Sequence, residues 1–432
     1  MVSDSRPGGR PDSSAPVTGG TLATGTPPAA GRAPSPRRAL TAALVAQVAV
    51  SVSEQGLPVL TGFIKRDLAL SAAVAGVLVG AVPAGKAIGS YAAGAAVDRV
   101  GERRVLALGA MLFGVLVLVA TAAPFAALLA LLVIGGLFAA TATPAGGKLV
   151  LLSFPVTRRG VAMGIRQTGI PLGGLVAALL LPWLAGAWGW RTGLVAAGVL
   201  TIAGGAAALA MAGMEPRARR RGRGEPRRPR ERGRFSRDRD MRLLTLWGCM
   251  MVGGQYVLIA FLPLHVHEGG AISLAAAALW LVSIAQVGGV LGRIGWGAVS
   301  DRLLGGRRRP LLAVISAIGA AGFLALAMLP ADAPVAVFAV AGLLGGISVI
   351  GWQGMFITSL AEMAGPTRAG AATGFALTFV SVGIAAAPPV FGLIADLAGS
   401  YEAMWLALAI VVTLSLVPAL LVREPSEVPA PA

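Results

Sequence analysis

The chain carries one charged stretch twice. The first copy reads Gly94-Ala-Ala-Val-Asp98-Arg99-Val-Gly101-Glu102-Arg103-Arg104. The second copy reads Gly297-Ala-Val-Ser-Asp301-Arg302-Leu-Leu-Gly305-Gly306-Arg307-Arg308. The spacing from the first glycine to the Asp-Arg pair is the same in both, and each copy follows a long apolar run. This pattern indicates an internal duplication.

Two further pairs of segments repeat in the same order. Leu57-Pro58 is matched by Leu262-Pro263. Arg158-Arg159-Gly160-Val-Ala-Met-Gly164 is matched by Arg368-Ala-Gly370-Ala-Ala-Thr-Gly374. Three matches in order predict a six-helix unit duplicated in parallel, an architecture found in transporters whose halves rock about a central site.

The composition places most of the chain in a membrane. Of the 432 residues, 56% are hydrophobic and 13% are charged, whereas a soluble domain has about 25% charged residues. A helix needs about 20 mostly apolar residues to cross the hydrocarbon. Continuous apolar runs predict helices and not the alternating strands of a barrel. Twelve such runs cover residues 39–63, 72–97, 105–122, 125–147, 161–184, 192–212, 243–264, 274–299, 311–329, 334–360, 370–395 and 402–422. The predicted fold is therefore an all-α integral membrane protein of two six-helix bundles.

The basic residues predict the topology. Of the 36 Lys and Arg, three lie inside spans and three lie in odd-numbered connections, namely Lys65, Arg66 and Arg191. The other 30 lie in the tails and even-numbered connections. Since cytoplasmic loops carry the excess of Lys and Arg, we expect a multi-pass protein of the plasma (inner) membrane with both termini cytoplasmic. The same distribution accounts for the net charge of +17 without a nucleic-acid partner.

The segments outside the spans are polar. Residues 1–38 are rich in Gly, Pro, Ser and Arg and are predicted to be a disordered cytoplasmic tail. The N-terminal half then covers residues 39–212, and the C-terminal half covers residues 243–422. A basic linker with thirteen Arg, residues 213–242, joins them, and residues 423–432 form a second tail. We interpret the linker as solvated, with contact to anionic lipid headgroups as the alternative.

The duplicated loop resembles the signature between helices two and three of the major facilitator superfamily: Gly, then Asp-Arg, then Gly and basic residues. The resemblance covers about residues 39–422. It implies a secondary transporter that works by alternating access on a small-molecule substrate, with no cofactor. We see no nucleophile–base arrangement, so we do not expect an enzyme, and a monomer is the default.

The resemblance also implies a gating role for the loop. In the family, the loop Asp engages neighbouring helix ends and basic residues and releases them as the halves rock. An Asp near a helix N-terminus gains roughly 0.3–1 kcal/mol, enough to bias two states of similar energy. Gly89 and Gly94 are expected to let helices approach closely. A solvated charged turn is the alternative for each residue. The gating residues implied are Gly94, Asp98, Arg99, Gly101, Arg103, Gly297, Asp301 and Arg302.

The chain departs from the family's proton-coupled antiporters. Those typically carry an Arg on helix four in an Arg-x-x-x-Gly pattern, where this chain has Leu132 and Gly136. The stretch Gly169-Ile170-Pro171-Leu172-Gly173-Gly174 is similar to the antiporter pattern Gly-Pro-x-x-Gly-Gly, but Ile170 stands before the proline. The first departure argues against drug–proton antiport, and the partial match argues for export.

Four charged residues lie inside predicted spans, where charge is costly and therefore points to function. At a rise of 1.5 Å per residue, Lys86 lies about 18 Å from Asp98, near the midplane. Arg293 and Arg166 lie about 12 Å and about 10 Å deep, and Glu54 lies in the outer half of the first span. They fall on helices one, two, five and eight, which in the family line the central cavity.

Three cations against one acid favour an anionic substrate. We expect Arg166 and Lys86 to hold it with help from Arg293, because arginine can bind a carboxylate with two parallel hydrogen bonds. Glu54 is the candidate proton-coupling residue. Neighbouring polar and aromatic groups complete the predicted substrate-binding set, namely Gln167, Gln255, Tyr256, Trp352 and Gln353. The predicted function is therefore proton-linked transport of a small organic or inorganic anion.

Alternatives stay open at this point. Arg166 and Arg293 are shallow enough to snorkel to the cytoplasmic interface, Lys86 could pair only with Glu54, and polar side chains could serve interhelical hydrogen bonding. Proton-driven efflux of drug-like or lipophilic compounds is the alternative function, and a solute-sensing membrane receptor is a third. His265-Val-His267-Glu268 lacks a visible third or fourth metal ligand, so no metal is predicted. We see no Walker-type phosphate loop in the sequence, so ATP-driven pumping is not predicted.

Overall fold

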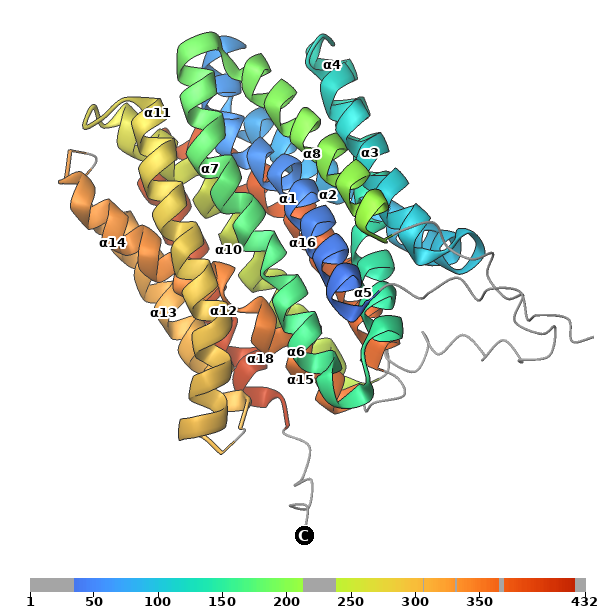
Figure 1. Cartoon of the computed structure of the whole chain (residues 1–432). Coiled ribbons are helices and arrows are strands. Elements are labelled where there is room, and N and C mark those ends of the chain that lie inside the picture. The colour runs from blue at the N-terminus through green and yellow to red at the C-terminus, as the bar shows by residue number, and fades with distance from the viewer. Residues whose placement is uncertain (1–34, 213–237, 306, 331, 365–368, 424–432) are drawn as a thin grey trace, which may run out of the picture. The chain divides into compact units, whose positions relative to one another are not determined.

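The computed structural model describes residues 35–212, 238–305, 307–330, 332–364 and 369–423. Most of the predicted N-terminal tail, linker and C-terminal tail therefore lie outside the described residues. The described chain is helical and contains no strand. We call the end of the bundle where α1 begins and α18 ends the tail end, and the opposite end the distal end (Figure 1).

The N-terminal half consists of eight helices, and two pairs of consecutive helices each make up a single span. They are α1 (Pro36–Asp67), α2 (Ala72–Val100), α3 (Glu102–Ala120), α4 (Phe125–Ala139), α5 (Ala142–Ser153), α6 (Val156–Gln167), α7 (Gly169–Trp188) and α8 (Trp190–Ala212). The α4–α5 and α6–α7 pairs each form one long span.

The C-terminal half follows the same order. Its helices are α10 (Arg239–Glu268), α11 (Leu274–Ala277), the π-helical turn η1 (Ala278–Val282), α12 (Ser283–Leu303), α13 (Arg309–Met328), α14 (Val335–Gly345), the π-helical turn η2 (Gly346–Ile350), α15 (Gln353–Ala364), α16 (Ala369–Ala398), α17 (Tyr401–Leu414) and α18 (Leu416–Leu421). In the described residues, twelve helical segments are long and apolar enough to cross a membrane. All twelve predicted spans are confirmed.

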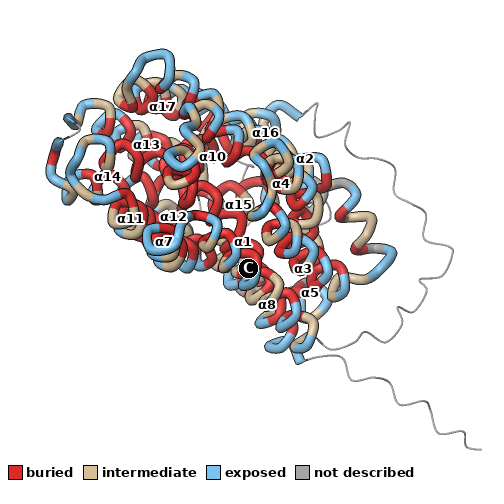
Figure 2. Tube along the Cα trace, turned by 90° about the horizontal axis from the view of Figure 1, so that it is seen from above, coloured by how far each residue is buried: buried red, intermediate tan, exposed pale blue. Residues whose placement is uncertain are grey.

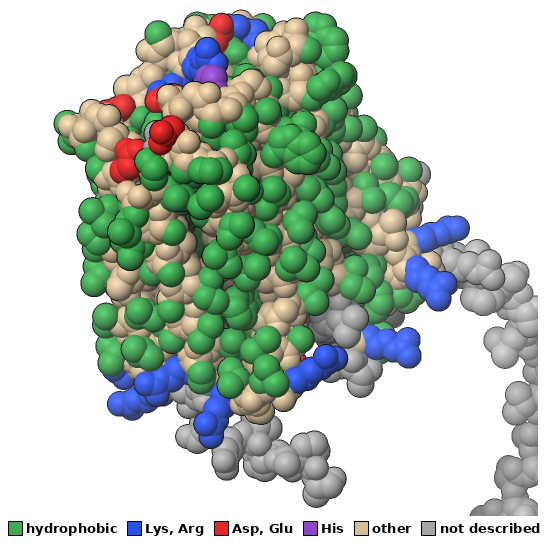
Figure 3. Space-filling view, turned by 90° about the vertical axis from the view of Figure 1, so that its left-hand side faces the viewer, with side chains coloured by type: hydrophobic (Ala, Val, Ile, Leu, Met, Phe, Trp, Pro, Cys, Tyr) green, Lys and Arg blue, Asp and Glu red, His purple; other side chains and the backbone are tan. Residues whose placement is uncertain are grey.

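Each half has its own hydrophobic core. The core of the first half includes Phe113 and Leu132, and the core of the second includes Trp247, Phe323 and Trp405. Figure 2 shows the buried segments towards the middle of the bundle and exposed segments around its rim. The flank drawn in Figure 3 is apolar over its middle, with basic side chains at the tail end and acidic and basic ones at the distal end. An apolar flank between charged ends suits a protein embedded in lipid.

The duplication seen in the sequence is also present in the packing. A Cβ on Gly89 would overlap the backbone of Leu137, and a Cβ on Gly292 would overlap the backbone of Ile347. Gly89 stands five residues before Gly94, as Gly292 stands five residues before Gly297. Thus the second helix of each half crosses the fourth at equivalent glycines, as close packing of helices in lipid requires. The expectation for Gly94 is wrong, because a Cβ there would meet no atom within 4 Å.

The apolar pattern did not predict that four spans contain breaks. One break lies at Gly351 and Trp352, between η2 and α15, and the other three lie beside prolines. These three lie between α4 and α5, between α6 and α7, and between α17 and α18. Each of the three lies within four residues of a proline, namely Pro144, Pro171 and Pro418. A proline has no N–H to donate to the carbonyl four residues earlier, so that carbonyl is released from the helix. The carbonyl released by Pro171 belongs to the candidate site.

Candidate functional site

An ion pair joins the first two spans in the middle of the bundle. Lys86 Nζ of α2 donates to Glu54 Oε1 of α1 at 2.6 Å. The hydroxyl of Tyr256, on α10 of the other half, donates to the same oxygen at 3.2 Å. The Glu54 side chain is 8% exposed and that of Lys86 is 21% exposed. One carboxylate oxygen therefore holds a cation of its own half and a hydroxyl of the opposite half.

Arg293 makes a second connection between the halves. Its Nη2 donates to Gln353 Oε1 at 2.6 Å, within the C-terminal half. Its Nη1 donates to the backbone carbonyl of Gln167, at the end of α6 in the N-terminal half, at 3.2 Å. The guanidinium thus points towards the other half and does not snorkel. Gln167 contributes to this contact through its backbone.

Arg166 is buried within the N-terminal half. It is 1% exposed, and its Nη2 donates at 2.8 Å to both Gln47 Oε1 and the carbonyl of Ala142. Its Nε and Nη1 have no hydrogen-bond partner in the part of the chain that the structure describes. A Cβ on Gly146 would lie 2.6 Å from Arg166 Nε, so this glycine makes room for the guanidinium. Arg166 therefore retains donors but does not reach the tail-end surface.

The remaining predicted binding residues are buried. Gln255 is 1% exposed, and among the described residues its Oε1 has no partner. Trp352 is fully buried and packs edge-on against Trp247, with 5.5 Å between ring centroids, while the ring of Phe356 lies tilted against it at 5.0 Å. Trp352 thus belongs to an aromatic cluster of the C-terminal half. From the sequence we expected this side chain to contact the substrate.

One ion pair and several hydrogen bonds join the halves at the distal end. Lys65 Nζ donates to Glu268 Oε1 at 3.0 Å, and the Tyr401 hydroxyl donates to the same oxygen at 3.0 Å. Arg66 Nη1 contacts His267 Nε2 at 2.9 Å, while His267 Nδ1 lies 2.9 Å from the Ile272 carbonyl. The Nδ1 atom must donate to that carbonyl, so Nε2 accepts from Arg66. These contacts hold the ends of α1 and α10 together.

A carboxylate of the C-terminal half caps α2. The two oxygens of Asp396, on α16, accept from the backbone N–H groups of Ala72 and Ala73 at 2.8 and 2.7 Å. The first N–H groups of a helix have no partner within it, so an acid there satisfies them and favours the helix dipole. Near this cap α2 and α16 pack closely, since a Cβ on Gly76 would overlap the backbone of Pro388. Asp396 therefore fastens the halves at the distal end.

The predicted gating residues lie at the tail end. Arg99 and Arg302 are exposed there, and Gly297 would meet no atom within 4 Å if it carried a Cβ. Gly101 has a φ of 100°, which favours glycine at the junction of α2 and α3. Arg103 lies beside it at the start of α3. The side chain of Asp98 lies outside the described residues, so its role stays a prediction.

In the second copy of the loop, the partner of Asp301 is Arg308. Arg308 Nη1 donates to Asp301 Oδ1 at 3.0 Å, and Nη2 donates to Glu362 Oε1 of α15 at 3.0 Å. Burial lowers the pKa of the Arg308 guanidinium, but hydrogen bonds and attraction to Glu362 and Asp301 outweigh it and raise the pKa. Arg308 therefore stays charged and links the loop to the end of α15.

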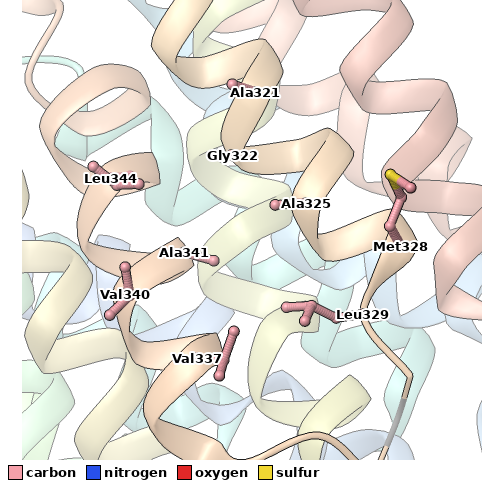
Figure 4. Close-up of a pocket in the computed structure, with 9 residues that line it drawn as sticks. All are labelled: Ala321, Gly322, Ala325, Met328, Leu329, Val337, Val340, Ala341 and Leu344. Atoms are coloured by element: carbon pink, nitrogen blue, oxygen red, sulfur yellow. The ribbon is translucent and has the colours of Figure 1, made fainter.

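Two hollows lie away from the candidate residues. One of about 350 Å³ lies between α13 and α14, and Figure 4 shows its apolar lining. It is lined by Ala321, Gly322, Ala325, Met328, Leu329, Val337, Val340, Ala341 and Leu344. The other, of about 550 Å³, lies at the distal end beside Arg66 and Ser273. The first hollow presents no polar side chain, so its chemistry suits lipid chains and not a charged solute.

The sequence matches a family model along almost all of its helical part. The model is described as Major Facilitator Superfamily and matches residues 43–359 and 280–432.

The chain belongs to the major facilitator superfamily.

Curated relatives agree with this membership. An uncharacterized MFS-type transporter of Mycobacterium tuberculosis is 32% identical over 360 residues, covering 81% of this chain and 76% of the relative. The gallate transporter of Pseudomonas putida is 28% identical over 64% of this chain and 67% of its own length. The hexuronate transporter of Bacillus subtilis is 28% identical over 33% of this chain and 34% of its own length. The protein is therefore a multi-pass membrane transporter and not an enzyme.

Solved structures share the fold. A bacterial homologue of the human lysosomal transporter Spinster, in an inward-facing and unoccupied conformation, superposes with a TM-score of 0.73 at 18% identity. The match covers 91% of this chain and 98% of the other. At this identity the likeness concerns the fold alone.

Sequence reasoning missed several residues that join the halves of this superfamily member. These residues lie at or near helix ends, where polar and charged side chains are common, so the sequence did not predict contacts for them. They are Lys65, Glu268, Tyr401 and Asp396. Arg308 is part of the repeated loop, but the sequence did not show that it contacts Asp301. Asp396 lies near the end of its own helix, and nothing in the sequence shows that it meets the first N–H groups of α2.

Proposed function

We propose that this transporter moves a small organic anion, with proton coupling through Glu54. The observation that carries the proposal is the excess of positive charge inside the spans. Lys86, Arg166 and Arg293 contribute three cations inside spans, and Glu54 contributes one acid. An excess of positive charge in a membrane interior is costly unless it serves a negatively charged partner.

The shared oxygen of Glu54 suggests how a proton and an anion would be coupled. While Glu54 is ionised, it holds Lys86 at 2.6 Å and accepts from Tyr256. Protonation removes the charge that holds Lys86, so the ammonium becomes available to a substrate carboxylate. An anion on Lys86 in turn favours the protonated acid, because two negative charges near one cation repel. Proton and anion would therefore bind cooperatively, which is the requirement for symport.

The names of two relatives support an organic anion. Gallate and hexuronates are both small carboxylates that carry several hydroxyl groups. The carboxylate suits arginine and lysine donors. The hydroxyl groups suit buried amides, and Gln255 Oε1 lacks a partner in the described chain. A hydroxylated carboxylate is therefore the substrate class that we propose.

The orientation follows from the positive-inside rule. Basic residues in the described connections gather at the tail end, among them Arg99, Arg104, Arg307 and Arg309, whereas the distal end carries Lys65, Arg66 and Arg191. We therefore propose that the tail end faces the cytoplasm of a bacterial plasma membrane. The closed distal end would then correspond to a state in which the site is shut off from the outside.

Ligand-dependent thermal stabilisation of the purified protein tests the substrate class. The panel contains gallate, glucuronate, inorganic phosphate and the lipophilic cation tetraphenylphosphonium. A ligand at 100 times its Kd adds about 2.7 kcal/mol of stability. We expect gallate or glucuronate to raise the melting temperature of the wild type and of Lys148→Met, a lysine outside the site, but not of Lys86→Met. Stabilisation by the lipophilic cation alone, unchanged in Lys86→Met, would refute the proposal and favour efflux of lipophilic compounds.

A further inference from the structure

The break between α6 and α7 leaves one backbone carbonyl without its helical donor. In a continuous helix the Gln167 carbonyl would accept from the N–H of residue 171. Residue 171 is proline, which has no N–H. A carbonyl left unpaired inside a membrane protein costs several kcal/mol, so a donor must come from elsewhere. The structure supplies that donor from the opposite half.

Arg293 of α12 is that donor. Its Nη1 lies 3.2 Å from the Gln167 oxygen, while Gln353 holds its Nη2 at 2.6 Å. Its Nε has no partner in the described part of the chain. One guanidinium thus joins the halves through a neutral acceptor. A cation bound to a neutral carbonyl remains a strong site for an anion, because bonds between two charged groups are stronger.

The pseudo-symmetric counterpart of this contact, between the second and eleventh spans, lacks both the proline and the arginine. Counting from the matched glycines Gly164 and Gly374, the equivalent of Pro171 is Ser381 and the equivalent of the Gln167 carbonyl is that of Leu377. Ser381 Oγ donates to the Leu377 carbonyl at 2.9 Å within its own helix.

The position equivalent to Arg293 is likewise a serine. Counting from Gly94 and Gly297, it is Ser90, whose Oγ donates at 2.5 Å to the Lys86 carbonyl of its own helix. Proline and arginine therefore occur together on one side of the pseudo-symmetric bundle, and serines replace both on the other. This joint difference indicates that Pro171 and Arg293 serve one purpose.

We propose that the Gln167 carbonyl occupies the place on Arg293 that a substrate carboxylate takes. When the anion binds, Arg293 gives up its hydrogen bond to the Gln167 carbonyl and donates to the substrate carboxylate instead. The halves then lose the contact that Arg293 makes between them. The exchange rests on the proposed function, because it requires an anionic substrate. It gives Pro171 a defined role, which is to keep the carbonyl available to Arg293.

The substitution Pro171→Ala tests the exchange. Alanine restores the N–H, so the Gln167 carbonyl can accept within its own helix and competes less for Arg293. We expect gallate to bind the variant about 2- to 10-fold more tightly than the wild type, the range that corresponds to one hydrogen bond. Pro182→Ala is the matched control, because Pro182 lies in the same helix and is not placed against Arg293. Its gallate affinity should equal that of the wild type.

A second measurement needs no ligand. The melting temperatures of the wild type, Pro171→Ala, Arg293→Gln and the double variant form a double-mutant cycle. We expect Arg293→Gln to lower the melting temperature less in the Pro171→Ala background, where the carbonyl already has a donor. Additive effects would refute the link between Pro171 and Arg293.

The two measurements separate the possible failures. Equal gallate affinity in the wild type and Pro171→Ala, with a coupled cycle, would refute the exchange and leave anion transport standing. If neither the wild type nor any of the variants binds gallate or glucuronate, the proposed function is refuted. The proposed exchange is then refuted as well, whatever the double-mutant cycle shows.

Discussion

Replacing Asp396 by alanine removes the carboxylate that caps α2 from the opposite half. Its two oxygens accept from the Ala72 and Ala73 N–H groups at 2.8 and 2.7 Å. Alternating access requires the halves to part at the distal end, and water then satisfies those groups. The cap therefore stabilises the closed state, and its loss favours the open one.

The size of this effect follows from the geometry. Loss of an N-cap side chain costs about 0.5–2 kcal/mol, and an acid at a partly exposed helix N-terminus falls in the same range. Because the side chain is exposed, we expect about 1 kcal/mol. At 1.4 kcal/mol per factor of ten, the ratio of closed to open molecules falls about fivefold.

Distance measurements by double electron–electron resonance would detect the shift. Spin labels placed at Ala122 and Ala398, both exposed at the distal end, report the separation of the halves. The single native cysteine, Cys249, is replaced by alanine in all variants. Asp332→Ala is the control, because this exposed distal acid has no cross-half contact in the described structure. An unchanged distance distribution in Asp396→Ala, or an equal shift in Asp332→Ala, would show that the cap does not hold the halves together.

Four further substitutions test the helix packing, a tail-end ion pair and a buried arginine. Gly85→Val should lower stability by about 3 kcal/mol or more, because its Cβ would overlap the Val133 carbonyl, whereas Gly94→Val should change the melting temperature little. Arg308→Ala should lower the free energy of unfolding by about 1 kcal/mol at low salt, and by less in 0.5 M NaCl, where the Debye length is about 4 Å. Salt screens this contact because the partners of Arg308 are exposed. A loss of stability that does not depend on salt would contradict this expectation. Arg166→Met should lower the melting temperature without ligand, because it removes about 1.5–3 kcal/mol of buried charged hydrogen bonding, and an unchanged value would rule out this structural contribution.

The span pattern was readable from the sequence because length and apolarity decide membrane crossing. The sequence also predicted a close helix approach at Gly89, but only the structure shows that the fourth span is the neighbour there, and that Gly292 meets the tenth span in the same way. Helix breaks were harder to predict. Pro171 breaks its span, whereas Pro58 and Pro263 lie inside continuous helices. Whether a proline breaks a helix depends on which neighbours can satisfy the freed carbonyl, and those neighbours are distant in sequence.

The sequence predicted the candidate site as a set of residues and gave the Lys86–Glu54 pair as one alternative, but it did not give the partners of Arg166 and Arg293. Charge inside a span identified Glu54, Lys86, Arg166 and Arg293, because such charge is rare and costly. Depth along a helix could not show which of them pair, since this depends on helix rotation and on contacts between the halves.

The tail-end loop illustrates the same limit at short range. Gly305 has a φ of 59°, which turns the chain and places Arg308, not the adjacent Arg302, beside Asp301. A turn of this kind depends on a backbone conformation that only glycine adopts readily. Sequence adjacency alone therefore could not show that Arg308 is the residue that contacts Asp301.

Gallate and glucuronate uptake into proteoliposomes tests proton-linked anion transport most directly. Uptake is measured with and without an inside-alkaline pH gradient, for the wild type and for Glu54→Gln. The account predicts that the gradient accelerates uptake of at least one of the two anions by the wild type, and that Glu54→Gln loses the acceleration while still exchanging labelled for unlabelled anion. Wild-type uptake that ignores the gradient, or a Glu54→Gln variant that responds to it like the wild type, would contradict the account.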